Sequence, residues 1–260
     1  MTQVLANIHP GAQLHPSVLV EAFATIQDDV IIGEGTWIGP NAVIMSGSRI
    51  GKNCKIFPGA VIGGIPQDLK FAGEYTTVEI GDNTTVRECV TVNRGTVDRL
   101  KTVVGNNVLL MAYVHVAHDC IVGNNCILAN NATLGGHVIV EDYAILGGGV
   151  MVHQFSLVGK HAMVSGGGIV IQDVPPYVTT GRYPVAYGGV NKIGLGRRNF
   201  SPESISLIEE MYRIIFMSNR NTSQALQYIE ENIADCTEKT EVLGFIRKST
   251  RGIIKKKPKS

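Results

Sequence analysis

A period of six residues dominates the first two thirds of the sequence. Every sixth residue from Ile8 to Val170 gives 28 positions, and 25 of them are Ile, Leu or Val. Because these three types make up about 30% of residues 8–170, chance would fill only roughly eight of the positions. A period of six is neither the 3.6 of an α-helix nor a simple alternation of two. It predicts short strands separated by turns, with one aliphatic side chain of each strand pointing inward.

Three such hexads make a coil of 18 residues, which is the hexapeptide pattern of a parallel β-helix. Successive coils would stack about 4.8 Å apart, so that each backbone pairs with the coils on either side. Glycine often follows the inward residue, as at Gly33, Gly51 and Gly147, where a turn or a close-packed corner would need it. The 30 glycines and only 16 aromatic residues agree with a narrow interior filled by aliphatic side chains.

The repeat is interrupted at about residues 64–77 and 93–103, where we expect loops to leave the prism, and such loops often carry function. Ser201 followed by Pro202 predicts the start of a helix. Further helices are expected near 222–234 and 240–250. We therefore predict a β-helix domain over residues 1–190 and a small helical domain over 191–260, ending in a frayed tail from Lys255 to Lys259.

Charge is divided unevenly along the chain. Residues 1–170 carry 9 Lys and Arg against 13 Asp and Glu, whereas residues 171–260 carry 14 against 9. The basic second part is therefore expected to face an acidic partner. No apolar run approaches the roughly 18 residues of a membrane span, and the N-terminus lacks a signal-peptide pattern. We expect a cytoplasmic protein with no membrane span and no nucleic-acid partner.

Five of the seven histidines lie between residues 115 and 161. His118, Gly136 and Gln154 are each 18 residues apart, so they should stack in one column on an edge of the prism. His118 lies two positions after the inward Val116 and should point outward. An outward histidine beside a carboxylate suits a general base, although a lone surface histidine is usually just solvated. The column and its neighbours comprise His118, Asp119, Gly136, His137, His153 and Gln154.

Several segments then resemble one family, the bacterial UDP-N-acetylglucosamine O-acyltransferases, which catalyse the first step of lipid A synthesis. The resemblance covers nearly the whole chain, through Arg197-Arg198 to Ser249–Gly252. The hexads alone would indicate only the broad superfamily of hexapeptide-repeat transferases. The segments that carry the resemblance are Ile65–Lys70, Asn93–Val97, Val116–Cys120, Leu128–Leu134 and Asp173–Val178.

The resemblance implies a left-handed β-helix of triangular section, followed by a helical domain, in a homotrimer with active sites between subunits. It also implies direct transfer of a 3-hydroxyacyl chain from acyl carrier protein to the sugar 3-hydroxyl, without a cofactor or metal. His118 would be the general base, supported by Asp119, and the Gly136 N–H would stabilise the oxyanion. The trimer is also expected because the two loops have nothing on their own chain to close upon.

Substrate-binding positions follow from the same resemblance. One set matches positions that hold the sugar and acyl groups, and a second set matches positions around the nucleotide. Gly166 matches the position that measures acyl-chain length, and its glycine favours a chain of about fourteen carbons or more. The first set is Asp68, Lys70, His115 and His137, and the second is His153, Gln154, Asn191, Arg197 and Arg198.

Two positions depart from the family pattern. Ile193 stands where an acid often follows the nucleotide-binding asparagine, and Asn93 stands where the second loop often has histidine. Three other readings remain open at the level of sequence. A γ-class carbonic anhydrase would use His115, His118 and His137 as zinc ligands. A related serine or sugar-nucleotide N-acyltransferase would use an amine acceptor, and a non-catalytic hexad scaffold would use none of these histidines.

Overall fold

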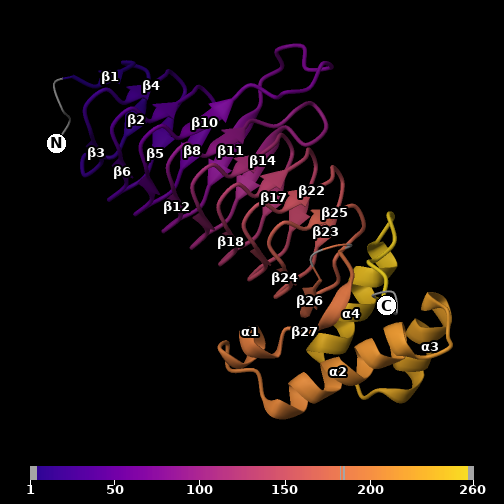
Figure 1. The fold of residues 1–260 in the computed structure, drawn as a ribbon. Coiled ribbons are helices and arrows are strands. Elements are labelled where there is room, and N and C mark those ends of the chain that lie inside the picture. The colour runs from indigo at the N-terminus through magenta and orange to yellow at the C-terminus, as the bar shows by residue number, and fades with distance from the viewer. Residues whose placement is uncertain (1–4, 182, 184, 257–260) are drawn as a thin grey trace.

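The computed structural model describes residues 5–181, 183 and 185–256. The chain forms the left-handed parallel β-helix that the hexads and the resemblance predict. Its coils stack from the N-terminus towards a group of helices at the other end (Figure 1). Consecutive strands of the chain fall in three different sheets, so the prism has three faces.

The first face carries the strand of the candidate base. Its nine parallel strands pair in register, for example Val116 with Leu134. The first-face strands, in order, are β1 (Asn7–Ile8), β4 (Thr25–Ile26), β7 (Val43–Ile44), β10 (Val61–Gly64), β13 (Thr91–Asn93), β16 (His115–Val116), β19 (Thr133–Leu134), β22 (Met151–Val152) and β25 (Ile169–Val170).

The second and third faces complete the triangle. The second-face strands are β2 (Gln13–Leu14), β5 (Ile31–Ile32), β8 (Ser48–Ile50), β11 (Thr77–Ile80), β14 (Lys101–Val104), β17 (Ile121–Val122), β20 (Ile139–Val140) and β23 (Leu157–Val158). The third-face strands are β3 (Leu19–Val20), β6 (Trp37–Ile38), β9 (Lys55–Ile56), β12 (Thr85–Val86), β15 (Leu109–Leu110), β18 (Ile127–Leu128), β21 (Ile145–Leu146), β24 (Met163–Val164), β26 (Val178–Thr180) and β27 (Tyr187–Val190).

Inward residues of the hexads form the core, as the period predicts. Val116, Val122 and Leu128, one from each face of a single coil, have no exposed surface. Asp119 and His137 occupy equivalent turn positions of successive coils with positive φ angles of 58° and 63°. Such left-handed turns close each corner and direct the turn side chains outward or along the corner.

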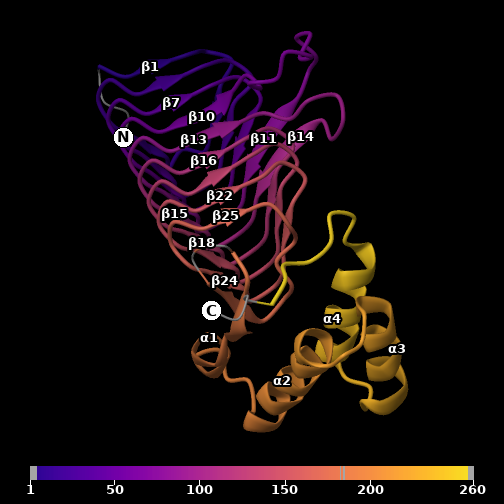
Figure 2. The same ribbon diagram turned by 45° about the vertical axis from the view of Figure 1, so that its right-hand side comes forward.

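Both predicted loops leave the prism where the repeat fails. The first loop connects β10 to β11, and the second connects β13 to β14. Figures 1 and 2 show them projecting together from one side of the prism beside β11 and β14.

Four helices follow β27: α1 (Lys192–Gly196), α2 (Pro202–Met217), α3 (Thr222–Asn232) and α4 (Thr237–Lys248). Ser201 caps α2 as predicted, by accepting a hydrogen bond from Ser204 N. Helix α1 was not predicted, because it has only five residues, and α4 begins three residues before the expected 240. None of the described helices is long and apolar enough to cross a membrane.

The chain after α4 returns to the prism, so the prediction of a frayed tail is wrong for Lys255 and Lys256. The N–H of Ile254 donates to the Asp173 carbonyl over 2.9 Å, and the Lys255 carbonyl accepts from Tyr187 N over 2.9 Å. Lys256 forms a bridge with Tyr187. Burial of Ile254, 2% exposed, anchors this segment. The rest of the expected tail, 257–259, lies outside the described residues.

Candidate active site

His118 and Asp119 lie in the turn between β16 and β17, at the corner between the first and second faces. The His118 Nδ1 atom lies 2.8 Å from Asp119 Oδ2. The Asp119 carboxylate is fully buried, while the imidazole is 13% exposed. A hydrogen bond from Nδ1–H to the carboxylate leaves the Nε2 lone pair free to accept a proton. The pair therefore has the arrangement of a general base and its orienting acid.

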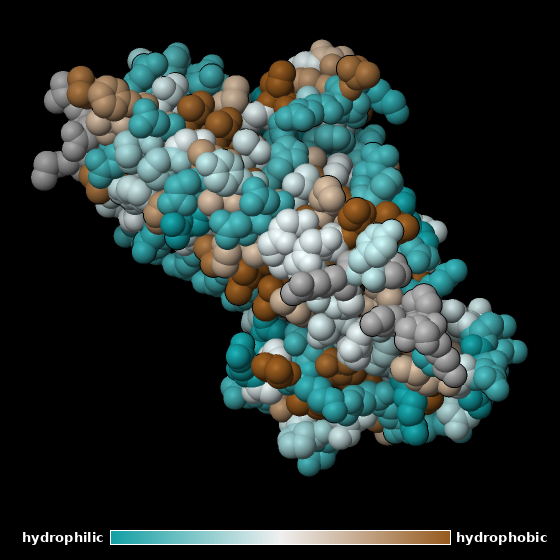
Figure 3. Space-filling model, in the orientation of Figure 1, coloured by the Kyte–Doolittle hydropathy of each residue, from teal (hydrophilic) through white to brown (hydrophobic). Residues whose placement is uncertain are grey.

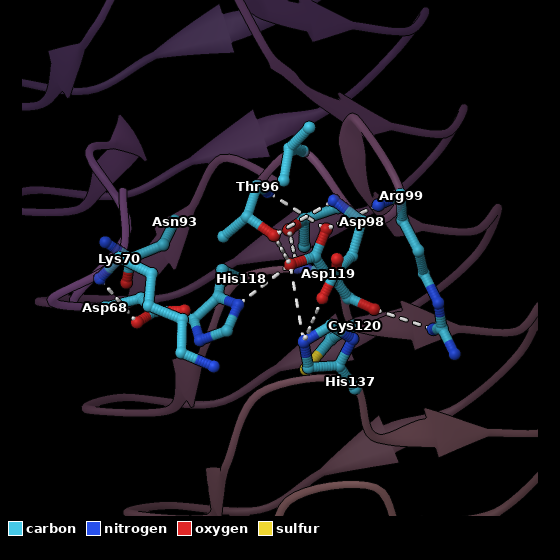
Figure 4. A network of polar contacts seen from close by, with 12 residues as sticks. Asp68, Lys70, Asn93, Thr96, Asp98, Arg99, His118, Asp119, Cys120 and His137 are labelled. Atoms are coloured by element: carbon cyan, nitrogen blue, oxygen red, sulfur yellow. Dashed lines mark hydrogen bonds and ion pairs between the residues drawn. The ribbon is translucent and has the colours of Figure 1, made fainter. Parts of the chain in front are cut away.

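Asp119 is surrounded by donors from the second loop (Figure 4). Its Oδ1 accepts from Thr96 N over 2.9 Å and from Arg99 N over 3.3 Å, and its Oδ2 accepts from Thr96 Oγ1 over 2.6 Å. Burial alone would raise the pKa of Asp119, but the hydrogen bonds from Thr96 and His118 outweigh it and lower the pKa below its ordinary value. Asp119 is therefore held as an anion.

This arrangement corrects one expectation from the sequence. The second loop does close upon its own chain, because Thr96 and Arg99 bind Asp119 directly. The two loops also join each other, since Val97 N donates to Glu74 Oε1 over 3.1 Å. Loop residues without periodicity give no sequence signal for such contacts.

Gly136 lies against the ring of His118. A Cβ atom at this position would lie 2.6 Å from both Cε1 and Nε2 of the imidazole, which is closer than packed atoms approach. The Gly136 N–H makes no hydrogen bond within the described part of the chain. Glycine thus leaves space for the base and a backbone donor beside its reactive nitrogen, as the column arithmetic suggested.

His137 completes the cluster from the next coil. Its Nε2 lies 3.7 Å from Asp119 Oδ2 and 3.6 Å from Asp98 Oδ2, and its ring stacks on Phe155 with centroids 4.5 Å apart. Burial lowers the pKa of His137, against the opposing effect of Asp119. The sequence analysis missed Phe155, although it follows His137 by one coil of 18 residues and the same arithmetic would have found it.

The remaining residues expected at the sugar and acyl groups lie nearby. His115 is on β16, where its Nδ1 lies 2.7 Å from Thr91 Oγ1, and burial, followed by the charge of His118, lowers its pKa. Asp68 accepts from Lys70 N over 2.9 Å in the first loop. Figure 4 shows both loop residues on the opposite side of the His118 ring from Asp98 and Arg99.

The zinc ligands of the carbonic anhydrase reading do not converge. Among the described residues, the ligand atoms that lie within 4.8 Å of one another belong to His118, Asp119 and His137, not to three histidines. Asp119 in this group already accepts four hydrogen bonds from the protein. The donor set is that of an oriented acid–base pair.

The residues expected at the nucleotide divide between two corners. His153 and Gln154 are exposed on the corner of His118. Asn191 instead caps α1 through Gly194 N, and its amide donates to the His161 carbonyl over 3.0 Å. These last contacts lie at the corner between the second and third faces.

Both arginines follow α1. Arg198 donates to the Tyr143 carbonyl over 3.0 Å and lies 5.2 Å from the centroid of that ring, while Arg197 is exposed. Because Tyr143 lies in the turn between β20 and β21, these arginines are also at the corner between the second and third faces. A single chain therefore does not bring them to His118.

His161 is stacked between Tyr143 and Tyr177, with centroid distances of 4.8 and 5.6 Å. Its side chain is buried, and its Nδ1 has no hydrogen-bond partner in the described part of the chain. Burial, followed by the charges of Arg198 and Lys160, lowers the pKa of His161 to about 4. The packing that joins the helical domain to the prism therefore requires a neutral imidazole.

We expect the protein to lose stability as the pH falls. Below about pH 6.5 an unfolded chain protonates His161, whereas the folded chain resists this until about pH 4. In that window the free energy of unfolding should fall by up to about 1.4 kcal/mol per pH unit because of this residue. Chemical denaturation at several pH values measures the slope. A His161→Phe variant, which keeps the stack, should show a smaller slope, and an equal slope would contradict the assignment.

An apolar groove of about 540 Å³ lies at the helical end of the first face. It is lined mainly by aliphatic residues, and Lys255 and Lys256 form part of its wall. In Figure 3, brown atoms gather at the position that β25 occupies in Figure 1. The apolar lining consists of Ile169, Ile171, Tyr183, Val185, Ala186 and Ile254.

Comparisons with known proteins bear on this site. The family model described as UDP-N-acetylglucosamine O-acyltransferase, domain 2, matches residues 173–254, and that of the bacterial transferase hexapeptide (six repeats) matches 29–64 and 101–136. A UDP-N-acetylglucosamine acyltransferase from Bacteroides fragilis is 50% identical, with a TM-score of 0.96, covering 98% of this chain and 100% of that chain.

Two further solved structures are similar over nearly the whole chain. The UDP-N-acetylglucosamine acyltransferase of Francisella novicida is 37% identical, with a TM-score of 0.95, covering 98% of this chain and 94% of that chain. The enzyme of the same name from Campylobacter jejuni is 34% identical, with a TM-score of 0.93, covering 99% of this chain and 100% of that chain.

Proposed function

The chain belongs to the family of UDP-N-acetylglucosamine O-acyltransferases, and we propose that it transfers a (R)-3-hydroxyacyl chain to the 3-hydroxyl of UDP-N-acetylglucosamine. This reaction is the first step of lipid A synthesis. The observation that carries the proposal is the oriented pair of His118 and Asp119, with Gly136 against the free ring nitrogen. The carbonic anhydrase and N-acyltransferase readings are not favoured.

The geometry supports direct transfer without a covalent enzyme intermediate. His118 Nε2 takes the proton of the sugar hydroxyl as its oxygen attacks the carbonyl carbon of a thioester. The negative charge that develops on the carbonyl oxygen is stabilised by the Gly136 N–H. The carbon–sulfur bond then breaks, and the imidazolium returns the proton to the leaving thiolate. The carboxylate of Asp119 stabilises the imidazolium between these steps.

The donor in this proposal is an acyl carrier protein, which carries the thioester on its own prosthetic group. Three features support it: the positive helical part of the chain, the apolar groove beyond the base, and the lysines in the groove wall. His115 on β16 and Ile169 on β25 lie on the same face, three coils or about 14 Å apart. An acyl chain could extend along this face while the carrier binds near the basic end. No bound cofactor or metal is required, and the proposed compartment is the cytoplasm.

A homotrimer would reunite the two halves of the substrate site. Within one chain, the base and the residues Arg197 and Arg198 lie at different corners of the prism. Threefold packing of prisms would place one chain's corner against a neighbour's, so that active sites form between subunits. Sedimentation of the purified protein measures this state directly.

The proposed reaction can be tested with UDP-N-acetylglucosamine and a series of acyl carrier protein thioesters of different lengths. Mass analysis should show one added acyl group, and mild base should remove it because the product is an ester. The control acceptor is the corresponding sugar nucleotide with a 3-amino group. An amide formed in preference to the ester would contradict the proposal.

Gly166 is proposed to set the length of the acyl chain. It lies in the turn from β24 into β25, and a Cβ atom there would approach the Gly148 carbonyl oxygen at 3.0 Å. A Gly166→Met side chain would therefore have to occupy the space beside the turn. We expect at least about tenfold lower kcat/KM for chains of about fourteen carbons, with shorter chains retained or improved. Competition between thioesters of different length measures this, and an equal loss at every length would contradict it.

A further inference from the structure

The second loop has a closer relation to the base than the proposed mechanism uses. Thr96 is 5% exposed and gives the Asp119 carboxylate two hydrogen bonds, one to each oxygen. Its hydroxyl binds Oδ2, which is the same oxygen that accepts from His118 Nδ1. Two donors therefore share one carboxylate oxygen, and only one of them belongs to the base.

We propose that Thr96 is a positioning residue that acts through Asp119 to hold His118 in its reactive tautomer and to limit how strongly the carboxylate attracts the imidazole proton. The inference rests on the proposed function, because it assigns a role to a residue behind the same base. A carboxylate oxygen that already accepts a short hydroxyl bond is a weaker acceptor for a second donor. Deprotonated His118 is consequently available at lower pH than it would be beside a free carboxylate.

The rest of the loop fixes Thr96 in this place. Arg99 donates through Nη1 to the Asp119 carbonyl over 2.7 Å, and the N–H of Asp119 donates to Thr102 Oγ1 over 2.8 Å. Asp119 is thus bound by the loop through its main chain and its side chain. The anionic state of Asp119, whose pKa these bonds lower against the effect of burial, agrees with this role.

Other charged groups also face the pair and must be held constant in a test. They come from β16, from the next coil and from both loops, and every variant below keeps all of them. These groups are His115, His137, Asp98, Arg99, Glu74, Asp68 and Lys70.

The Thr96→Val variant removes the hydroxyl while keeping the shape and the backbone N–H. We expect kcat/KM at neutral pH to fall by about tenfold, since a bond to a charged group is lost. The acidic limb of the kcat/KM profile should move upward by about 0.5 to 1 pH unit, because Asp119 then binds the imidazolium more strongly. Thr96→Ser keeps the hydroxyl and should restore the wild-type profile.

A matched control is Thr84→Val, which removes another fully buried threonine hydroxyl of the prism. Thr84 Oγ1 donates to the Gly105 carbonyl over 2.7 Å, away from the site. This variant should lower the melting temperature without moving the pH profile. Should Thr96→Val fail to fold, Thr96→Cys, whose thiol is a weak donor, should shift the limb in the same direction by a smaller amount.

A second readout does not depend on catalysis. In protein labelled with 15N at histidine, the His118 ring signals should titrate with a higher midpoint in Thr96→Val than in wild type, without any substrate. An unchanged midpoint together with an unmoved kinetic limb would overturn the role of Thr96 and make it merely structural. Absence of acyl transfer by the wild-type protein would instead refute the proposed function, while the ring titration would still test Thr96.

Discussion

Replacing His118 with alanine is expected to abolish acyl transfer while leaving a folded protein. Removal of a general base typically lowers the rate by about 10²-fold or more. The Nε2 atom beside Gly136 is the base of the proposed reaction, and the other histidines of the cluster are placed differently. His115 binds Thr91, and His137 is buried against Phe155. Steady-state kinetics with a long-chain thioester measures the loss.

The fold should survive this substitution. Without His118, Asp119 still accepts both bonds from Thr96 and one from Arg99 N. Calorimetry should show that the variant still binds UDP-N-acetylglucosamine, which separates loss of chemistry from loss of the site. His15→Ala, an exposed turn histidine of the same prism, is the matched control and should keep full activity. More than a few per cent of residual activity in His118→Ala would count against this base.

The repeat made most of the fold predictable. A period of six assigns one inward residue to each short strand, and the structure buries those residues because each strand offers one side chain to a narrow interior. The same arithmetic placed His118 and Gly136 at one corner, since residues 18 apart occupy the same point of successive coils. The interruptions were equally visible, because a charged residue such as Asp68 or Asp98 cannot occupy an inward position.

The parts that escaped prediction lie where no period applies. Thr96 and Arg99 reach Asp119 only because the second loop folds back, and a loop sequence does not encode its end position by spacing. The tail was mistaken because its lysines suggested solvent, whereas the buried Ile254 beside them decides its path. Asn191, assigned to the nucleotide by resemblance, caps a helix in this chain.

Gly136 illustrates how one residue can serve two purposes that the sequence does not distinguish. The resemblance assigns its backbone N–H to the oxyanion, and the structure adds that its missing side chain is the space in which the His118 ring lies. Alanine at this position keeps the N–H and removes the space. The substitution therefore separates the two contributions, because a catalytic N–H alone would tolerate a methyl group.

We expect Gly136→Ala to lower kcat/KM by about 10²-fold, because a displacement of the base by about 1 Å has an effect of that order. The added Cβ would lie 2.6 Å from His118 Nε2 and Cε1, so the ring must move away from the Asp119 carboxylate or from the substrate. The His118 titration in labelled protein should shift together with the rate. Gly244→Ala, in helix α4 where an added Cβ has no atom within 4 Å, is the control and should remain fully active. Near-normal activity in Gly136→Ala would mean that the ring has room to move without loss, and would leave the backbone donor as the only role of this glycine.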